Sequence, residues 1–336
     1  MSRNVTLKDV AAYAGVSVTT VSNVVRNWPY VSPAMRDHVQ RAIDALGYSP
    51  HLVAQGLRTG QTQALAFIVP DLSNPYFAEI VSAAEDAAQT YGYILLVFNS
   101  HEDADREAAC IQRATSRSAD GLLITHSLQT RWSEALSNNV DIPIVAVDRI
   151  PEHDQHPVCA VDNFRAGQLA TSHLLELGHR RIAHIAGPKR IRTAQDRSNG
   201  YLQIVDEQGM EYRRIVYSDD TWGPGAGYHC MMELLNDGNR PTAVFTSNDR
   251  MAIGALHALY DRGLRVPDDI SIVGLDDIEV SAHLTPPLTT MRQPLDRLAG
   301  AAVEMLLRLI RGETLGQRIV LLEPELVVRQ STAPIP

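Results

Sequence analysis

The sequence predicts a small all-helical head followed by an α/β body made of two doubly wound parallel-sheet lobes. Two observations lead to this fold class. Short helices with recognisable caps fill the first 50 residues, and from residue 63 apolar strand-like runs alternate with amphipathic helices. With 336 residues, of which 45% are hydrophobic, the chain is long enough for about two or three domains with cores of their own.

The head begins with two short helices joined by a tight turn. Thr6 is typical of an N-cap and Asp9 stands three positions later, which is a variant of the capping box. Gly15 ends this helix, and Ser17 caps the next one almost at once. A third amphipathic helix is expected from about Pro33 to Leu46, with Gly47 as its stop. Three such helices enclose one small core.

The first two helices have the spacing of a helix-turn-helix motif. In this motif the early residues of the second helix face the DNA major groove, and here these are Val18, Thr19 and, one turn later, Asn23. As a bare pattern, two adjacent helices with a glycine turn also occur in helical proteins that do not bind DNA. The expected DNA contacts in the head are Thr6, Ser17, Val18, Thr19, Thr20 and Asn23.

Charge divides the chain in the same place. Residues 1–60 hold six Lys or Arg against three Asp or Glu, which is a net charge of +3. The whole chain has 30 basic and 39 acidic residues, so 24 basic and 36 acidic residues remain beyond position 60, a net charge of −12. A basic head on an acidic body favours a head that meets a polyanion.

The body repeats short apolar strands and amphipathic helices. Strands are expected at 64–69, 94–98, 121–124, 143–147, 182–186, 242–245 and 270–274, and helices at 76–91, 102–116, 165–177 and 249–261. Continuous apolar strands separated by helices indicate parallel sheets covered on both faces. Ligands of such folds bind beyond the carboxyl ends of the strands.

Polar and aromatic residues stand at those strand ends. Asp, Asn and Arg side chains supply paired acceptors and donors for neighbouring hydroxyl groups, and aromatic rings supply flat faces for a sugar ring or a base. Asp71 begins the first of these strand-end segments, and the residues expected around a small-molecule ligand are Asn74, Tyr76, Phe77, Asp148, Arg149, Thr193, Arg197, Trp222, Asn248 and Asp276. Taken singly, Asp148 or Asp276 could instead cap a strand, and Phe77 could belong to the core.

The head closely resembles that of the lactose/galactose-repressor (LacI/GalR) family. The resemblance rests on Leu7 to Val25, on Val31-Ser32 and on Ala42 to Pro50, and it continues into the body. It implies a transcriptional regulator, most simply a repressor, that binds a pseudo-palindromic operator as a homodimer. It also implies a hinge helix in which Ala54 and Leu57 contact the minor groove, with Leu57 as an apolar wedge between base pairs. Without the resemblance, Leu57 is an ordinary linker residue.

The body resembles ribose-type sugar-binding proteins at Ser73 to Phe77, Val147 to Arg149, Gln195 to Tyr201, Ser247 to Ala252, Gly274 to Asp276 and Thr290 to Gln293. This implies Asn74, Phe77, Asp148, Arg149, Arg197, Asn248, Asp276 and Gln293 as sugar contacts, with Tyr76 as a second aromatic. A monosaccharide such as a pentose is the expected effector. Thr193, Arg197, Trp222 and Asp276 also stand where the purine-responsive branch binds its ligand, but Ile191 replaces an arginine of that branch.

Two further alternatives concern the effector and the class of protein. Lys189, Arg190 and Arg192 could bind the phosphate of a sugar phosphate, or they could form a solvated surface loop. A sugar-handling enzyme is the rival from another class, but no nucleophile elbow, P-loop or dinucleotide-binding motif is present. We therefore expect no enzymatic activity, and the pattern is compatible with an inducer and with a corepressor.

The resemblance divides the chain into three parts. The DNA-binding head spans 1–48, the hinge helix and linker 49–62, and the effector-binding and dimerisation domain 63–336. Within that domain the N-lobe is expected at 63–161 plus 292–322, and the C-lobe at 162–291 plus 323–336.

The cellular setting follows from what the sequence lacks. The three cysteines, Cys110, Cys159 and Cys230, are far apart and indicate neither disulfides nor a zinc site. No apolar run reaches 18 residues, and the charged amino terminus is unlike a signal peptide. We expect a cytoplasmic protein that needs no cofactor, metal or membrane.

Overall fold

The computed structural model describes residues 5–25, 28–48, 62–116, 119–127, 140–150, 156–219 and 221–335. It divides into two compact units, Met1–Gln63 and Ala64–Pro336, which we describe separately. The predicted hinge residues Ala54 and Leu57 lie outside the described residues. No helix within these ranges is long and apolar enough to cross a membrane.

The first unit contains the three predicted helices, α1 (Leu7–Ala14), α2 (Val18–Val25) and α3 (Pro33–Leu46). Thr6 and Asp9 form a capping box at the start of α1, and Ser32 caps α3 ahead of a proline in its first turn. Both α1 and α3 end on a glycine in the left-handed conformation, Gly15 at φ 63° and Gly47 at φ 61°.

The core of this unit is small. Each helix contributes one fully buried valine, Val10, Val21 and Val39, and the three belong to one hydrophobic cluster. His38 on α3 places its Nε2 atom 2.8 Å from the carbonyl oxygen of Ala14, which ties α3 to the end of α1. Three short helices are thereby held in a fixed arrangement that leaves the outer side of α2 exposed.

The second unit contains two six-stranded sheets. Sheet A has the order β11-β5-β4-β3-β1-β2, and all its strand pairs are parallel. Its strands are β1 (Ala64–Val69), β2 (Ile94–Asn99), β3 (Gly121–Ile124), β4 (Ile144–Val147), β5 (Val158–Val161) and β11 (Ile319–Leu322). Helices α5 (Pro75–Thr90), α6 (Ala104–Thr115) and α12 (Leu295–Ile310) cover it.

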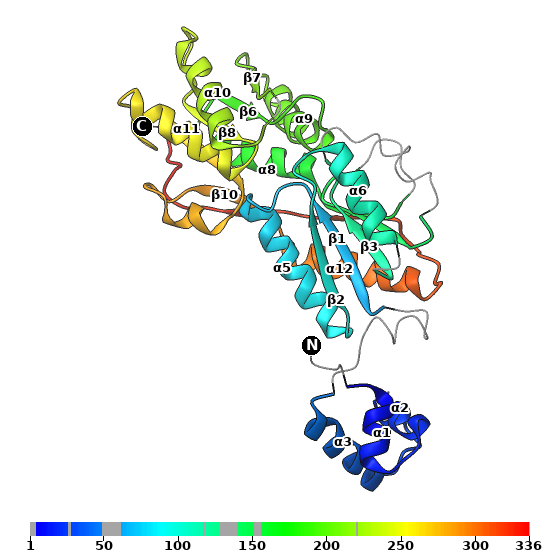
Figure 1. Ribbon diagram of the computed structural model, residues 1–336. Helices are drawn as coiled ribbons and strands as arrows, with labels where there is room; N and C mark the ends of the chain where they lie inside the picture. The colour runs from blue at the N-terminus through cyan, green and yellow to red at the C-terminus, as the bar shows by residue number, and fades with distance from the viewer. Residues whose placement is uncertain are drawn as a thin grey trace. The chain divides into compact units, whose positions relative to one another are not determined.

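The alternation of side chains along β1 shows how sheet A is covered on both faces. Leu65, Phe67 and Val69 pack with α5 and α12, whereas Ala66 and Ile68 pack with α6 on the opposite face. Figure 1 shows α6 and α5 on either side of β1 and β2. Because every residue of β1 is buried, its sequence is a continuous apolar run.

Sheet B has the order β12-β10-β9-β8-β6-β7. Its strands are β6 (Ile182–Ala186), β7 (Arg214–Tyr217), β8 (Ala243–Thr246), β9 (Ser271–Asp276), β10 (Thr289–Arg292) and β12 (Glu325–Val327). Helices α8 (Asn163–Glu176) and α9 (Arg192–Glu207) cover one face, and α10 (Pro224–Asn236) and α11 (Asp249–Asp261) the other. A short 3-10 helix, η1 (Glu279–His283), follows β9.

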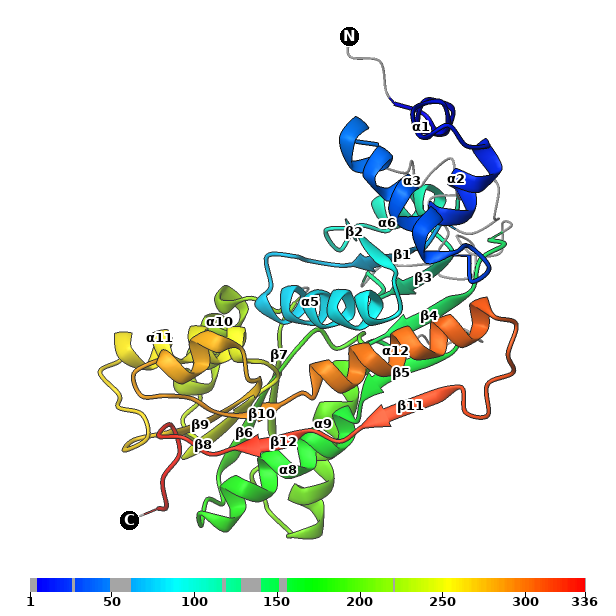
Figure 2. The ribbon, with the colours of Figure 1, turned by 90° about the horizontal axis from the view of Figure 1, so that it is seen from below.

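One strand departs from the parallel arrangement, because β12 is antiparallel to β10. The chain leaves β11 at the carboxyl edge of sheet A and continues directly into β12, so it enters sheet B from that sheet's carboxyl edge (Figure 2). Two other passages between the sheets occur at Asp162, between β5 and α8, and at 293–294, between β10 and α12. Three crossings at one edge place the carboxyl ends of both sheets against each other.

Candidate functional site

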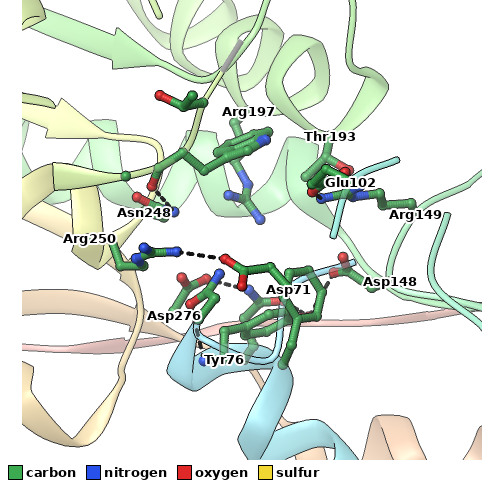
Figure 3. Close-up of a pocket in the computed structure, with 16 residues that line it drawn as sticks. Asp71, Tyr76, Glu102, Asp148, Arg149, Thr193, Arg197, Asn248, Arg250 and Asp276 are labelled. Carbon is green, nitrogen blue, oxygen red and sulfur yellow. Dashed lines mark hydrogen bonds and ion pairs between the residues drawn. The ribbon is translucent and has the colours of Figure 1, made fainter. Parts of the chain in front are cut away.

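A cavity of about 340 Å³ lies between the carboxyl ends of the two sheets. All eleven residues predicted around a ligand line it, and Figure 3 shows how side chains from both sheets converge there. Five further residues line it, which are Asp71, Glu102, Thr221, Gly223 and Arg250. Asp71 begins the first predicted strand-end segment, whereas sequence reasoning missed the other four. The volume falls within the range of small-molecule sites.

Tyr76 and Asp148 form one side of the cavity. Asn74 caps α5 by accepting a hydrogen bond from the Tyr76 backbone N–H, and the Tyr76 side chain then donates a 2.7 Å hydrogen bond to Oδ1 of Asp148. The same phenol oxygen lies 3.3 Å from Oε1 of Gln293. Burial, together with the charge of Asp148, raises the pKa of Tyr76 well above its ordinary value, so the phenol remains a donor.

Arg149 follows Asp148 at the end of β4 and is held by an ion pair. Its two terminal nitrogens donate to the carboxylate of Glu102 at 2.8 and 3.1 Å, which is a bidentate arrangement. The guanidinium carbon lies 5.8 Å from the centre of the Phe77 ring. Burial opposes the charged form, but Glu102 outweighs it and raises the pKa of Arg149, so the guanidinium stays charged.

Arg197 occupies the facing wall, on α9. Its Nε donates to Oδ1 of Asn163 at 2.8 Å, and Nη1 donates to the carbonyl of Ser247 at 2.5 Å. Its guanidinium carbon lies 5.7 Å from the centre of the Trp222 ring. Burial lowers the pKa of Arg197 from its ordinary value, and the nearby Asp276 works against this effect.

Asp276 and Gln293 complete the buried part of the lining. Gln293 donates from Nε2 to Oδ1 of Asp276 at 2.7 Å. Burial raises the pKa of Asp276 well above its ordinary value, and Arg197 opposes the shift. Both strand-end carboxylates have a positive φ, 69° at Asp148 and 130° at Asp276, which costs non-glycine residues backbone energy. Strained residues of this kind cluster at functional sites.

Asn248 and Trp222 are fixed by each other. Asn248 caps α11 through a 2.8 Å hydrogen bond from the Met251 N–H, and its Nδ2 donates to the carbonyl of Trp222 at 3.2 Å. A Cβ at Gly187 would stand 2.3 Å from the Trp222 ring, so only glycine leaves room for the indole in this position. The short β6 end thereby sets one aromatic wall of the cavity.

Behind the lining, Asp249 is fully buried and accepts three hydrogen bonds from two other parts of the chain. Ser281 Oγ and Thr290 Oγ1 each donate at 2.6 Å, and the Ile278 N–H donates at 3.1 Å. Gly274 on β9 gives the carboxylate its space, because a Cβ there would lie 2.1 Å from Oδ1. Asp249 therefore joins α11 to β10 and to the segment that carries η1.

The basic loop lies apart from the lining. Lys189, Arg190 and Arg192 do not line the cavity. The Lys189 Nζ lies 5.6 Å from the centre of the Tyr217 ring, and Arg192 forms an ion pair of 3.6 Å with Asp196. Across the part of the chain that is described, no group of three His, Cys, Asp or Glu residues could hold a metal ion.

In the head, the predicted DNA contacts gather at the start of α2. Val18 and Thr19 are exposed and Asn23 is half-buried, while Ser17 Oγ accepts from the Thr20 N–H at 3.0 Å and lies 2.8 Å from Thr20 Oγ1. Thr6 belongs to the capping box of α1. Val21 and Val24 are buried, so opposite sides of α2 face the core and the solvent.

Comparison with known families decides the identity of both parts. The model of bacterial regulatory proteins of the lacI family matches residues 6–51, and that of the periplasmic binding protein-like domain matches residues 171–332. The HTH-type transcriptional repressor PurR of Pasteurella multocida (strain Pm70) is 36% identical over 327 residues, which are 97% of this chain and 98% of that protein. The chain belongs to the LacI family of bacterial transcriptional regulators.

Solved structures of LacI-family proteins agree with this assignment. The lac repressor dimer bound to operator and to the anti-inducer ONPF has a TM-score of 0.87 at 32% identity, covering 98% of this chain and 100% of that one. A complex of the regulator CelR with cellobiose has a TM-score of 0.73 at 33% identity, covering 97% and 99%. A LacI-family regulator from Enterococcus faecium with bound ribose has a TM-score of 0.72 at 26% identity, covering 81% and 100%.

The LacI-family assignment establishes the general function. The chain is a DNA-binding transcriptional repressor with a small-molecule effector domain, because its relatives over nearly the whole length are repressors. The rival hypothesis of a sugar-handling enzyme is therefore set aside.

Proposed function

We propose that this LacI-family repressor binds a free monosaccharide, such as a pentose, in the cavity between its two lobes, and that binding changes its affinity for operator DNA. The observation that carries the proposal is that every arginine of the lining already has a partner within the protein. Each of the three arginines already has a partner: Arg149 pairs with Glu102, Arg250 with Asp71, and Arg197 with Asn163 and Ser247. Such a lining suits an uncharged ligand.

The remaining polar groups match hydroxyl chemistry. A hydroxyl group is at once a donor and an acceptor, and Asp148 and Asp276 offer acceptors from opposite walls of the cavity. Asn248 and Gln293 add amide groups, and Phe77 and Trp222 add aromatic faces. The ribose-bound relative from Enterococcus faecium supports the same class of ligand.

A purine is the second candidate, and it rests on the names of the relatives. The repressor from Pasteurella multocida and others at 35–37% identity are called PurR. Thr193, Arg197, Trp222 and Asp276 line the cavity at positions comparable to those of the purine-responsive branch. Ile191, which replaces an arginine of that branch, precedes α9 and does not line the cavity. The loss of that donor is why we place the monosaccharide first.

A sugar phosphate is a weaker fit than a free sugar. Its dianionic group would need unpaired cations, and the lining contains four carboxylates, Asp71, Glu102, Asp148 and Asp276, against three arginines. The loop with Lys189 and Arg192 does not contribute to the cavity.

The lobes and the head suggest how the effector acts. We propose that the ligand changes the angle between the N-lobe (63–161 plus 292–322) and the C-lobe (162–291 plus 323–336) by bending at the three crossings. In a homodimer this changes the spacing of the two heads (1–48), which are joined through the hinge segment 49–62. One head makes few base contacts, so a two-fold pseudo-palindromic site read by Val18, Thr19 and Asn23 of both subunits is expected.

A thermal-shift panel tests the effector class. Pentoses, hexoses, their phosphates and purines are each added to the purified protein, since a ligand at about 100 times its dissociation constant stabilises by about 2.7 kcal/mol. We expect stabilisation by a free monosaccharide, and loss of that response in Asp148→Ala. A response confined to purines, or to phosphorylated sugars, would refute the proposal. Arg265→Ala, on an exposed pair with Asp268, is the matched control and is expected to respond like the wild type.

A further inference from the structure

Two ion pairs line the cavity, and they differ in what they join. Glu102 and Arg149 both belong to the lobe built on sheet A. Asp71 follows β1 of sheet A, whereas Arg250 lies in the first turn of α11 on sheet B, and their Oδ2 and Nη1 atoms are 3.4 Å apart. Figure 3 shows this contact between Arg250 and Asp71. The Asp71–Arg250 pair therefore joins the two lobes across the cavity.

The pair lies where the cavity meets solvent. The side chains of Arg250 and Asp71 are 23% and 31% exposed, whereas Asp148, Asn248 and Asp276 are at most 6% exposed. Gly223, another lining residue, is next to Arg250, because a Cβ there would stand 4.0 Å from Nη2. A ligand that reaches the buried carboxylates must therefore be enclosed beneath this contact or pass beside it.

Asp71 is oriented for the contact before Arg250 arrives. Its Oδ1 accepts from the backbone N–H of Ser73 at 2.9 Å and from Ser73 Oγ at 2.6 Å, which leaves Oδ2 for the arginine. Arg250 is oriented by its place in α11, two residues after the Asn248 cap. Each partner is fixed within its own lobe, so the ion pair forms only when the lobes have the spacing seen here.

We propose that the Asp71–Arg250 pair is a latch that determines effector size and residence time: it closes the rim over one sugar ring and excludes a second ring. The proposal rests on the monosaccharide function proposed above and adds the residues that set its size limit. Solved relatives hold both one-ring and two-ring sugars, ribose in one and cellobiose in another, so the size limit varies within this fold. In this chain the latch is the element placed to impose it.

The test compares D-ribose and cellobiose on three variants by calorimetry and stopped-flow fluorescence. Arg250→Ala removes the ion pair that spans the opening of the cavity. We expect the affinity of this variant for cellobiose to be at least about ten times that of the wild type. Asp71→Asn keeps the acceptor for Ser73 but removes the charge, so we expect D-ribose to dissociate about two- to fivefold faster. Arg265→Ala, whose ion pair lies within one lobe, should match the wild type in both measurements.

The salt dependence of D-ribose dissociation tests whether the Asp71–Arg250 pair acts on the bound ligand. A partly exposed ion pair is screened by salt, and the Debye length falls from about 14 Å at 0.05 M NaCl to about 4 Å at 0.5 M NaCl. D-ribose should therefore dissociate faster from the wild type at the higher salt concentration. Its dissociation from Asp71→Asn should not change with salt. If both variants keep the wild-type rates and cellobiose affinity, the latch is refuted and the monosaccharide proposal stands. If the wild type binds purines but no monosaccharide, the proposed function fails and the latch fails with it.

Discussion

The phenol of Tyr76 donates a 2.7 Å hydrogen bond to the carboxylate of Asp148, 72 residues later in the chain. Both side chains are almost fully buried, at 4% and 5% exposure, and both line the cavity. The bond connects the first turn of α5 to the end of β4 and holds an acceptor in place for a ligand. Because the bond fixes the position of the Asp148 carboxylate, less ordering is needed when a ligand binds.

Replacing Tyr76 with Phe tests this relationship. The variant leaves a buried carboxylate without its donor, so we expect the free energy of unfolding to fall by about 1–3 kcal/mol. Effector affinity should also fall, because Asp148 is no longer oriented. Urea unfolding and calorimetry measure the two effects. Tyr260→Phe, at a side chain that is 80% exposed, is the control and should leave both unchanged.

Gly187→Ala tests the aromatic wall. The added methyl group meets the Trp222 ring at 2.3 Å, so the indole has to move out of its place in the lining. We expect effector affinity to fall about tenfold, with operator binding in the absence of effector unchanged. Gly238→Ala, where a Cβ meets nothing within 4 Å, is the control. Equal effector affinity in both variants would mean that Trp222 does not contact the ligand.

His184 predicts how stability depends on pH. It is fully buried on β6, and its ring stacks on that of Phe245 with 4.5 Å between the ring centres. Burial lowers the pKa of His184 to about 3. The unfolded chain binds the proton near pH 6.5 and the folded chain does not, so acidification from 6.5 towards 3 destabilises the fold by about 1.4 kcal/mol per pH unit from this group.

His184→Phe keeps the stacking and removes the titration. Urea unfolding from pH 7 to pH 4 should show a shallower loss of stability than in the wild type. An unchanged slope would contradict the assignment.

Asp276 has the opposite effect on the pH dependence of stability. Its raised pKa lets the folded state hold a proton that the unfolded state releases above about pH 3.9.

Leu57→Ala tests the predicted wedge, which lies outside the described residues. A wedge between base pairs acts only on the bent operator, so specific binding should weaken far more than binding to random DNA. Anisotropy titrations with both DNAs at one fixed salt concentration measure the ratio. Leu52→Ala in the same segment is the control. An equal loss on both DNAs would show that Leu57 is an ordinary linker residue.

Much of the fold could be predicted because buried strands and helix ends have recognisable sequence patterns. The strand Ala64–Val69 is apolar throughout since both its faces are covered, and Gly15 and Gly47 end their helices in a conformation that glycine adopts freely. Ten of the eleven lining residues could be predicted because strand order brings the carboxyl ends of the strands together, and Gln293 followed from the resemblance to ribose-type binding proteins. The antiparallel strand β12 has no such sequence pattern and was not predicted.

The charge pairs could not be predicted. Asp71 and Arg250 are 179 residues apart, and neither stands out among the 69 charged residues of the chain. Glu102 lies in a loop whose position relative to Arg149 depends on the twist of sheet A. The three hydrogen bonds that Asp249 accepts from β10 and from the segment around η1 likewise depend on how these elements pack. Tertiary packing decides contacts of this kind.

Operator binding measured with and without an effector tests whether the cavity controls the DNA-binding head. A palindromic DNA selected from a random pool by the purified protein is titrated by fluorescence anisotropy, with D-ribose, other free monosaccharides, hypoxanthine or no addition. We predict that a free monosaccharide changes operator affinity by about fivefold or more, and that Asp148→Ala abolishes the change while retaining binding to the DNA. A change produced by hypoxanthine alone, with every monosaccharide silent, would contradict it.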